Sequence, residues 1–463
     1  MISTNINMII YLLPKINKNI YKYLGIQKKE EKPDPLISHS LSFYLNDTKS
    51  QIEGYENKWD IFKKYTNTFE YIHSTIPCKK TCVSKYKPIS RSYFKMVELI
   101  DEFQLGLDSP NPIQTFHLAE GPGGFIEAVI NHRKNTRIFR QISPEDKVGI
   151  NGELATSSAS TLVSSHNPSE DIYIGMTLLV SSDNDNPPPS WKKIQSFLKK
   201  NNNILLERGV DKTGNILSLP NLIRINEMYG NTMDFVTADG GFDFSGDFSN
   251  QELSMTRLLY GQIVFALCIQ KRGGCFVLKI FDCFMRSTVE LLALLCSVYD
   301  QVYITKPHTS RSANSEKYIV CKGFNHSSTQ LYPYLFFSFK EMLEGAPFIS
   351  SFFYRNVIPQ YFTQKMEKYN GIMGEKQLEN IRQTLELMKE DETNIWCKKE
   401  DKIIKELPVR FMDNISENGR RTFCSDIYTS EWGRNGKTNI NTLVKMNVTK
   451  CYHWCIKHNI ATE

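Results

Sequence analysis

The 463-residue sequence contains no apolar run that approaches the roughly 20 residues needed to span a bilayer. The N-terminal segment MIIYLLP is too short for the apolar core of a signal peptide, and nothing like a cleavage site follows it. Internal repeats are also absent. We therefore expect a globular protein with neither a membrane partner nor a secretory leader.

A strong charge of either sign is lacking as well. Lys and Arg together number 56 against 50 Asp and Glu, so the formal net charge is +6. This balance permits a polyanionic partner without demanding one, because the charge is diluted over a long chain. With 41% hydrophobic and 23% charged residues, the chain can build a sizeable core in one large domain with extensions, or in two to three ordinary domains.

The eleven cysteines show no disulfide framework and no zinc-finger spacing. Several lie inside apolar runs, as Cys268 does, where a free thiol packs as a small hydrophobe and a reducing compartment is indicated. Two pairs, Cys78 with Cys82 and Cys451 with Cys455, have three intervening residues each and would supply four ligands together. Neither pair lies in a knuckle or hairpin pattern, so we expect no metal.

Between about residues 90 and 325, apolar strand-like runs alternate with amphipathic segments of helix length. Strands alternating with helices predict an α/β fold, with a mostly parallel sheet covered on both faces. A Ser-rich insertion at 157–171 and a proline-rich loop at 181–191 interrupt the pattern.

The flanking regions have weaker periodicity. We divide the chain into a basic, Tyr-containing N-terminal extension (1–87), a central domain (88–330) and a mainly helical C-terminal accessory region (331–463). The N-terminal extension is interpreted as helical segments and loops outside the main core. A basic, aromatic extension of this kind is also able to follow an RNA backbone.

The segment TFHLAEGPGGFIEAV predicts a strand, a Gly-rich turn and a helix in immediate succession. Its glycines, at 121, 123 and 124, let a ligand approach the backbone, and the helix start offers free N–H groups. A dinucleotide cofactor stays open on this loop alone. Two details favour S-adenosylmethionine: Pro122 stiffens the turn, and Glu120 is unwelcome beside pyrophosphate but acceptable beside a sulfonium cofactor that carries an amino group.

Three charged residues are predicted to meet at the carboxyl edge of the sheet, where α/β folds bind ligands. Asp239 ends one strand, Lys279 lies late in the next, and Glu316 precedes a strand that returns antiparallel from a hairpin. A lysine within a strand is rarely buried without a partner. Lys95 is a fourth candidate, on a predicted helix with Ser90 as its N-cap.

Four motifs, EGPGGF, TADGG followed by NQE, FVLKIFD and SRSANSEKYIVCKG, resemble those of the FtsJ-like ribose 2′-O-methyltransferases. The resemblance covers about residues 88–325. It is nearest to the eukaryotic and large-DNA-virus branch that methylates the first transcribed nucleotide of capped mRNA. It implies a Rossmann-like fold with seven mostly parallel strands, one of them antiparallel, and S-adenosylmethionine as cofactor. The implied partners are capped mRNA and, beyond it, other capping enzymes or RNA polymerase.

The resemblance also assigns residues. Its catalytic tetrad falls on Lys95, Asp239, Lys279 and Glu316. Its cofactor loop falls on Ala119, Glu120, Gly121, Pro122, Gly123, Gly124 and Phe125, with Asp239 beside it. A second cofactor position, often Asp-Ile in the family, is occupied here by Asn215 and Ile216. The implied RNA contacts are Arg91, Asn250, Gln251 and Asn314.

The implied chemistry makes Lys279 the general base that takes the proton of a ribose 2′-OH. A neutral amine requires its pKa to fall by roughly 3 units, or about 4 kcal/mol. A second ammonium about 4 Å away, that of Lys95, supplies energy on this scale at an effective dielectric of about 20. Asp239 and Glu316 oppose the shift, so desolvation must contribute, or the carboxylates mainly orient both lysines. This chemistry needs no metal.

Two other functions stay open from the sequence. One is methylation of ribosomal RNA, the activity of the family's bacterial branch. The other is a non-catalytic RNA-binding subunit of a capping or polyadenylation complex. We expect a cytoplasmic location if the chain comes from a large cytoplasmic DNA virus and a nuclear one if it is cellular.

Overall fold

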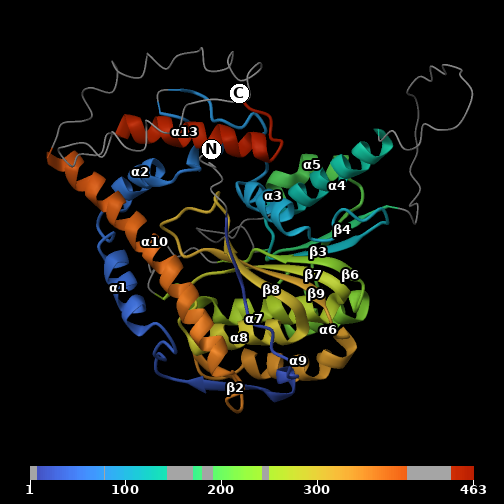
Figure 1. Ribbon diagram of the computed structural model, residues 1–463. Helices are drawn as coiled ribbons and strands as arrows, with labels where there is room; N and C mark the ends of the chain where they lie inside the picture. The colour runs from blue at the N-terminus through green and yellow to red at the C-terminus, as the bar shows by residue number, and fades with distance from the viewer. Residues whose placement is uncertain (1–7, 78, 143–169, 180–190, 242–249, 394–439) are drawn as a thin grey trace, which may run out of the picture.

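The computed structural model describes residues 8–77, 79–142, 170–179, 191–241, 250–393 and 440–463 (Figure 1). The predicted Ser-rich insertion at 157–171 and the proline-rich loop at 181–191 lie almost wholly outside these residues, and so does Cys78.

An eight-stranded sheet forms the centre of the molecule, in the order β1-β8-β9-β7-β6-β3-β4-β5 (Figure 1). Its strands are β1 (Ile9–Leu12), β3 (Gln114–Leu118), β4 (Ile172–Met176), β5 (Ile204–Glu207), β6 (Met233–Ala238), β7 (Gln270–Ile280), β8 (Tyr299–Lys306) and β9 (Lys317–Phe324). Strands β3 to β7 pair in parallel, whereas β9 is antiparallel to both β7 and β8. Apart from β1, this is the predicted Rossmann-like sheet of seven strands with one antiparallel member, so the predicted fold is confirmed.

The predicted hairpin β8–β9 determines where Glu316 lies in the fold. Strand β9 does not simply extend the sheet beyond β8, because it inserts between β8 and β7. Its register opposite β7 pairs Tyr318 with Lys279 and Lys317 with Ile280. The residue that precedes the strand, Glu316, is thereby delivered to the edge where β7 ends.

Helices cover both faces of the sheet, as predicted (Figure 1). One face carries α6 (Leu219–Tyr229), α7 (Gln251–Ile269) and α8 (Arg286–Val298), and the other carries α3 (Ser92–Phe103), α4 (Gly124–Ile142) and α5 (Gln195–Lys200). Side chains alternate between the two faces of a strand. Along β7, Phe276 and Leu278 therefore join the core under α7, while Val277 joins the core under α3. Double coverage explains why these strands are apolar throughout.

Helix α7 is long and apolar enough to cross a membrane by length and composition, which the sequence analysis did not anticipate. In the fold, 83% of its most apolar window is buried. It packs between the sheet and α9 (Ser328–Leu343). These properties are those of a core helix.

The N-terminal extension is not confined to helices outside the core, so that prediction was wrong. Strand β1 pairs with β8 at the sheet edge, and β2 (Leu24–Lys29) pairs with β10 (Phe348–Phe353). The intervening Ile20 and Tyr21 are completely buried in the core under α7. Strands this short carry too little alternation to be told from helix by pattern.

The rest of the N-terminal extension packs against the C-terminal region. Helices α1 (His39–Ser50) and α2 (Glu56–Thr66) contact the long helix α10 (Gln360–Thr393), and the short helix η2 (Glu70–Ile72) contacts α13 (Ile440–Lys457). The remaining short helices are η1 (Ile20–Tyr23) and η4 (Trp191–Ile194). Helix α9 crosses the predicted boundary at residue 330 and packs on α7, so this position is not a break in the fold.

The cysteines of the two pairs at 78/82 and 451/455 are buried thiols where the structure describes them. Cys82, Cys451 and Cys455 are free, and burial raises the pKa of Cys455 to about 12. Over the described ranges, no three His, Cys, Asp or Glu side chains are grouped so as to hold a metal ion. The Cys82 thiol donates to the Ser84 carbonyl oxygen at 3.3 Å and accepts from Lys87 Nζ at 2.7 Å, and the Cys451 thiol donates to the Thr68 carbonyl oxygen at 3.5 Å.

Glu290 connects α8 to β10 through hydrogen bonds. Its titration makes the free energy of unfolding depend on pH. Both of its carboxylate oxygens accept from Ser351 Oγ at 2.9 Å, and Oε2 accepts from Phe352 N at 2.6 Å. Burial raises the pKa of Glu290 from 4.5 to about 7, against the opposing effect of these donors and of Arg286. Between these two values the folded protein keeps a proton that the unfolded chain has released.

We predict that this group makes the free energy of unfolding fall as pH rises from about 4.5 to about 7, by about 1.4 kcal/mol per pH unit. Glu290→Gln removes this contribution, so its stability should decline less steeply over the window. Urea unfolding at several pH values measures the slope. Glu375→Gln, on the exposed side of α10, is the control and should keep the wild-type slope. An unchanged slope in Glu290→Gln would contradict the assignment.

Candidate active site

The structure brings the four predicted catalytic side chains together at the carboxyl edge of the sheet. Asp239 directly follows β6, Lys279 is the penultimate residue of β7, and Glu316 directly precedes the antiparallel β9. Lys279 is two residues beyond Val277, so it lies on the sheet face covered by α3. Lys95 lies on α3 itself. The sequence predicted this helix but could not show that it faces the strand ends.

The four groups form two ion pairs. Lys95 Nζ lies 2.7 Å from Glu316 Oε1 and 2.9 Å from Oε2, with only 7% and 12% of the two side chains exposed. Lys279 Nζ donates to the Asp239 carbonyl oxygen at 2.7 Å and lies 3.3 Å from Asp239 Oδ1. Each lysine is therefore held by a carboxylate from a neighbouring strand end.

Tyr318 links the two pairs. Its hydroxyl lies 3.1 Å from Asp239 Oδ1 and 3.4 Å from Glu316 Oε1, and the side chain is completely buried. Tyr318 was not among the site residues predicted from the sequence. Period-2 alternation along β9 contained the signal, since it puts Tyr318 on the same face of the strand as Glu316.

Burial and neighbouring charge set the protonation of the Lys95–Glu316 pair. Burial alone would raise the pKa of Glu316, but Lys95, Lys279 and Lys306 hold it well below its usual range. Burial lowers the pKa of Lys95, and Arg91 and Lys279 lower it further, while Glu316 and Asp239 oppose the shift. Glu316 is thus a fixed anion, and Lys95 is a cation that is destabilised by its surroundings and retained by its partner.

Lys306, at the end of β8, shapes the loop that delivers Glu316. Its ammonium donates to the main-chain oxygens of Asn314 (2.8 Å) and Glu316 (2.7 Å), and also to Asn314 Oδ1 (2.7 Å) and Ser310 Oγ (3.2 Å). Asn314, predicted as an RNA contact, therefore already uses its side-chain oxygen within the loop. Lys306 was not predicted as a site residue, although its position in the sequence, at the end of a strand and before a polar loop, was a usable signal.

A second buried cluster, made of polar and charged side chains, stabilises the same loop. Ser315 Oγ donates to Asp282 Oδ2 at 2.8 Å, and Lys317 Nζ lies 3.2 Å from Asp282 Oδ1. Lys49, from α1, donates to Asp282 Oδ2 at 2.9 Å and to Ser315 Oγ at 3.0 Å. The N-terminal extension thereby helps to fix the residue next to Glu316.

Helix α3 is anchored so that Lys95 faces the strand ends. One turn beyond Lys95, the buried carboxylate of Glu98 accepts from the main-chain nitrogens of His308 and Thr309, both at 2.8 Å. The N-cap of α3 is Arg91 and not the predicted Ser90, and it makes no side-chain capping bond. Ser90 instead contributes its carbonyl oxygen, which accepts from Tyr93 N.

The Gly-rich turn lies beside the tetrad, and two of its glycines are required by protein neighbours. A Cβ on Gly124 would lie 2.2 Å from Ser90 Oγ and Ser92 Oγ, so this glycine lets α4 start against α3. Gly123 has φ +113°, and a Cβ there would lie 2.4 Å from Ile194. Close packing, and not only ligand approach, therefore explains these two positions.

Glu120 is the group in this turn that points to a ligand. Its Oε1 accepts from Phe125 N at 2.6 Å, at the start of α4. Its Oε2 is buried and has no hydrogen-bond partner among the described residues. Burial, with Asp239 nearby, raises the pKa of Glu120 well above its usual range. A buried carboxyl oxygen without a partner indicates that a polar group of a ligand lies against it.

The predicted second cofactor position lies next to this turn. Thr177, after β4, accepts from Gly121 N through its hydroxyl at 3.2 Å, and Gly214 packs against its carbonyl oxygen. Within the neighbouring loop, Asn215 Oδ1 accepts from Leu217 N at 2.9 Å, and Ile216 is buried in the core. The segment is adjacent to the Gly-rich turn, while its Asn side-chain oxygen is engaged in a local turn.

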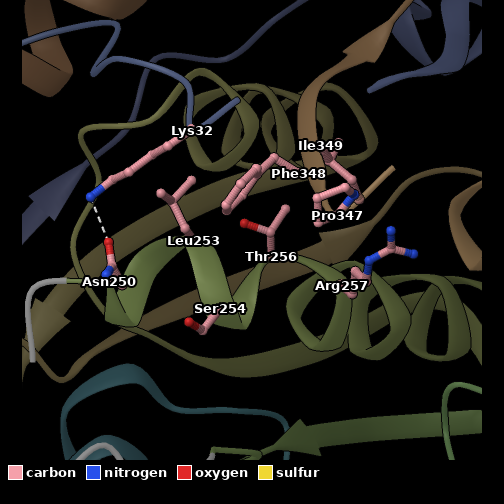
Figure 2. A pocket seen from close by; sticks show the side chains of 9 residues that line it. All are labelled: Lys32, Asn250, Leu253, Ser254, Thr256, Arg257, Pro347, Phe348 and Ile349. Atoms are coloured by element: carbon pink, nitrogen blue, oxygen red, sulfur yellow. Dashed lines mark hydrogen bonds between the residues drawn. The ribbon is translucent and has the colours of Figure 1, made fainter. Parts of the chain in front are cut away.

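The residues predicted to contact RNA are dispersed. Arg91 lies within electrostatic range of Glu316, whereas Asn250 Oδ1 accepts from Lys32 Nζ at 2.5 Å (Figure 2). Asn250 lines a cavity of about 320 Å³ between the first turns of α7 and the start of β10, with no tetrad residue in its wall (Figure 2). Gln251 begins α7, whose next residue, Glu252, lines a small cavity with Lys279.

A known protein family matches part of this sequence. The FtsJ-like methyltransferase family matches residues 169–324, a segment that contains Asp239, Lys279 and Glu316. Lys95 and the Gly-rich turn precede the matched segment.

Three curated proteins are similar to this chain. Cap-specific mRNA (nucleoside-2′-O-)-methyltransferase 2 of Danio rerio is 29% identical over 372 residues, which cover 76% of this chain and 44% of the relative. Cap-specific mRNA (nucleoside-2′-O-)-methyltransferase 1 of Dictyostelium discoideum is 30% identical over 319 residues, covering 67% and 38%. The protein of the same name from Trypanosoma brucei brucei is 42% identical over 118 residues, covering 25% and 32%.

The chain spans less than half the length of each of these relatives. The similarity confirms the predicted resemblance to FtsJ-like methyltransferases and to eukaryotic cap-specific mRNA methyltransferases. This chain contains an FtsJ-like methyltransferase domain.

Proposed function

We propose that this chain methylates the ribose 2′-OH of the first transcribed nucleotide of capped mRNA, with S-adenosylmethionine as the methyl donor. The observation that carries the proposal is the linked pair of buried lysine–carboxylate contacts beside the Gly-rich turn. The names of the three relatives support capped mRNA as the substrate.

The residues of the Gly-rich turn fit the cofactor. The unpartnered Oε2 of Glu120 suits its amino group, and the turn from Ala119 to Phe125 would hold it beside Asp239. When bound, S-adenosylmethionine supplies an electrophilic methyl group on a sulfonium. The chain then has to hold the ribose hydroxyl in line and accept its proton.

Each tetrad residue has a defined task in this proposal. Lys279 accepts the hydroxyl proton, and Asp239 holds Lys279 through both its carbonyl and its carboxylate. Glu316 keeps Lys95 in place. Burial lowers the pKa of Lys95, and Arg91 and Lys279 lower it further, against the opposing effect of Glu316 and Asp239.

Two other functions are less well supported. A non-catalytic RNA-binding subunit would tolerate loss of a tetrad residue, whereas all four are present and paired. Ribosomal RNA is a less favoured substrate because the three relatives are named for cap-specific mRNA methylation. The proposal extends to other capping enzymes and RNA polymerase as partners.

The substrate is tested by transfer of tritiated methyl from S-adenosylmethionine to RNAs of identical sequence, with and without a cap. Nucleoside analysis of the product should find the label on the 2′-O of the first transcribed nucleotide, and only in capped RNA. Equal labelling of both RNAs would overturn the substrate assignment. Label on a base would overturn the reaction.

We predict that Lys279→Ala lowers methyl transfer by at least about 100-fold, because general-base catalysis contributes on that scale. Binding of S-adenosylmethionine, measured by calorimetry, should stay within a few-fold of wild type. The matched control is Lys271→Ala, at the amino end of the same strand, where the lysine pairs with Asp234 at the surface. Wild-type turnover in Lys279→Ala would exclude Lys279 as the base.

We predict that Tyr318→Phe lowers kcat by about 10- to 100-fold, because it removes the link between Asp239 and Glu316 and lets both shift. The ring remains packed, so the thermal midpoint should change little. Tyr260→Phe removes another buried hydroxyl, which contacts Ser338 on α9, and serves as the control. If the two variants have equal kcat, Tyr318 does not position the tetrad.

A further inference from the structure

Gln262 is a buried polar side chain in an apolar stretch of helix α7. The side chain is completely buried, and between Leu258 and Ile269 the only other side chain with an oxygen or nitrogen atom is that of Tyr260. A primary amide in this position loses its hydration, which costs free energy unless a hydrogen bond replaces it. The presence of Gln262 therefore has to be explained by a specific partner.

That partner is the turn that follows β6. Gln262 Oε1 accepts from Gly240 N at 2.8 Å. The preceding nitrogen, Asp239 N, still donates to Leu118 O at 3.3 Å and so continues the pairing of β6 with β3. Gly240 is the first residue whose buried N–H takes its acceptor from the helix and not from the sheet.

The peptide unit held by Gln262 is also the one that holds Lys279. Its N–H belongs to Gly240 and donates to Gln262, while its carbonyl oxygen belongs to Asp239 and accepts from Lys279 Nζ at 2.7 Å. A trans peptide is planar, so its N–H and C=O point in opposite directions. Fixing the N–H on Gln262 therefore also fixes the direction in which the carbonyl oxygen meets the Lys279 amine.

The turn fits closely between the amide of α7 and the amine of β7. A Cβ on Gly240 would lie 2.6 Å from Gln262 Oε1 and 3.0 Å from Ala119 Cβ. A Cβ on Gly241 would lie 3.2 Å from Lys279 Nζ. Two consecutive glycines thus allow the main chain to touch both side chains at once.

The other half of the Gln262 amide shows which of its atoms is needed. Nε2 is buried and has no hydrogen-bond partner among the described residues. An unpaired buried donor destabilises the fold, and a methionine of similar size would avoid that cost. Methionine would, however, leave the Gly240 N–H without a strong acceptor. The acceptor oxygen is therefore the feature that explains a glutamine here.

We propose that Gln262 is a positioning residue for Lys279, and that it acts through the Asp239–Gly240 peptide. This inference rests on the proposed function, in which Lys279 takes the proton of the ribose 2′-OH. To do so, the amine has to direct its lone pair at the hydroxyl. A carbonyl oxygen that accepts one of its hydrogens restricts rotation of the amine and so favours one direction.

The first test separates the chemical step from binding. In Gln262→Met, which keeps the length of the side chain, kcat should fall by about 10-fold, while the KM for RNA and the Kd for S-adenosylmethionine stay within about three-fold. Gln262→Glu keeps an oxygen acceptor for Gly240 N and should retain kcat within about three-fold of wild type. Assays are run well below the thermal midpoint of each variant.

Gln270→Met is the matched control for loss of a buried glutamine. Gln270 is also completely buried, donates to Met233 O at 3.1 Å and accepts from Tyr299 at 3.1 Å. It begins β7, at the end of the strand opposite to Lys279, so its replacement should lower the thermal midpoint and leave kcat near wild type. Equal losses of kcat in Gln262→Met and Gln270→Met would overturn the proposal.

A second test needs no turnover, so it remains informative if the proposed function fails. Acylation by a small amine reagent, followed by mass spectrometry, measures the reactivity of Lys279 in the full chain. The rate should change at least about two-fold in Gln262→Met, because the amine is no longer fixed, and return towards wild type in Gln262→Glu. Lys271, at the amino end of the same strand, should react at one rate in all three proteins.

The two tests fail in distinguishable ways. Absence of methyl transfer to capped RNA by the wild-type chain would refute the proposed function and leave the acylation rates to decide the role of Gln262. Wild-type acylation of Lys279 in Gln262→Met would overturn the positioning role, and so would a wild-type kcat in an active enzyme.

Discussion

Lys95 and Glu316 form a buried ion pair that joins α3 to the start of β9, and much of the remaining structure serves to keep it closed. Breaking such a pair typically costs about 3–5 kcal/mol, because one charge is left buried without a partner. Glu98 anchors α3 to the loop after β8, and Lys306 fixes the turn that precedes Glu316. The pair therefore lies in a scaffold whose parts come from distant positions in the chain.

The regions outside the central sheet belong to this scaffold. Lys49 from α1 binds Asp282 and Ser315, the residue next to Glu316. Glu70 from η2 binds Arg311 in the loop that precedes Glu316. Helices α10 and α13 in turn pack on α2 and η2. The N- and C-terminal regions thus act as one support for the site, and not as independent appendages.

The sequence alone was sufficient to predict the sheet and the positions of three tetrad residues. The ends of strands and the alternation of side chains along them can be recognised from short stretches of sequence. Asp239, Lys279 and Glu316 could be assigned to one edge once the hairpin was predicted. It was not sufficient for Lys95, whose orientation depends on how α3 packs against Gly124, nor for Glu70 and Lys306, whose partners are defined only by tertiary contacts. Strand β1 was missed because four residues carry almost no periodic signal.

We infer that Lys95 and Glu316 act on catalysis as one unit. A double-mutant cycle on kcat with Lys95→Met and Glu316→Gln tests it most directly, with folding checked by the thermal midpoint of each variant. We predict strong non-additivity: the double variant should lose about as much activity as the more impaired single variant. If the losses of the two single variants simply multiply in the double variant, Lys95 and Glu316 act independently and the account is contradicted.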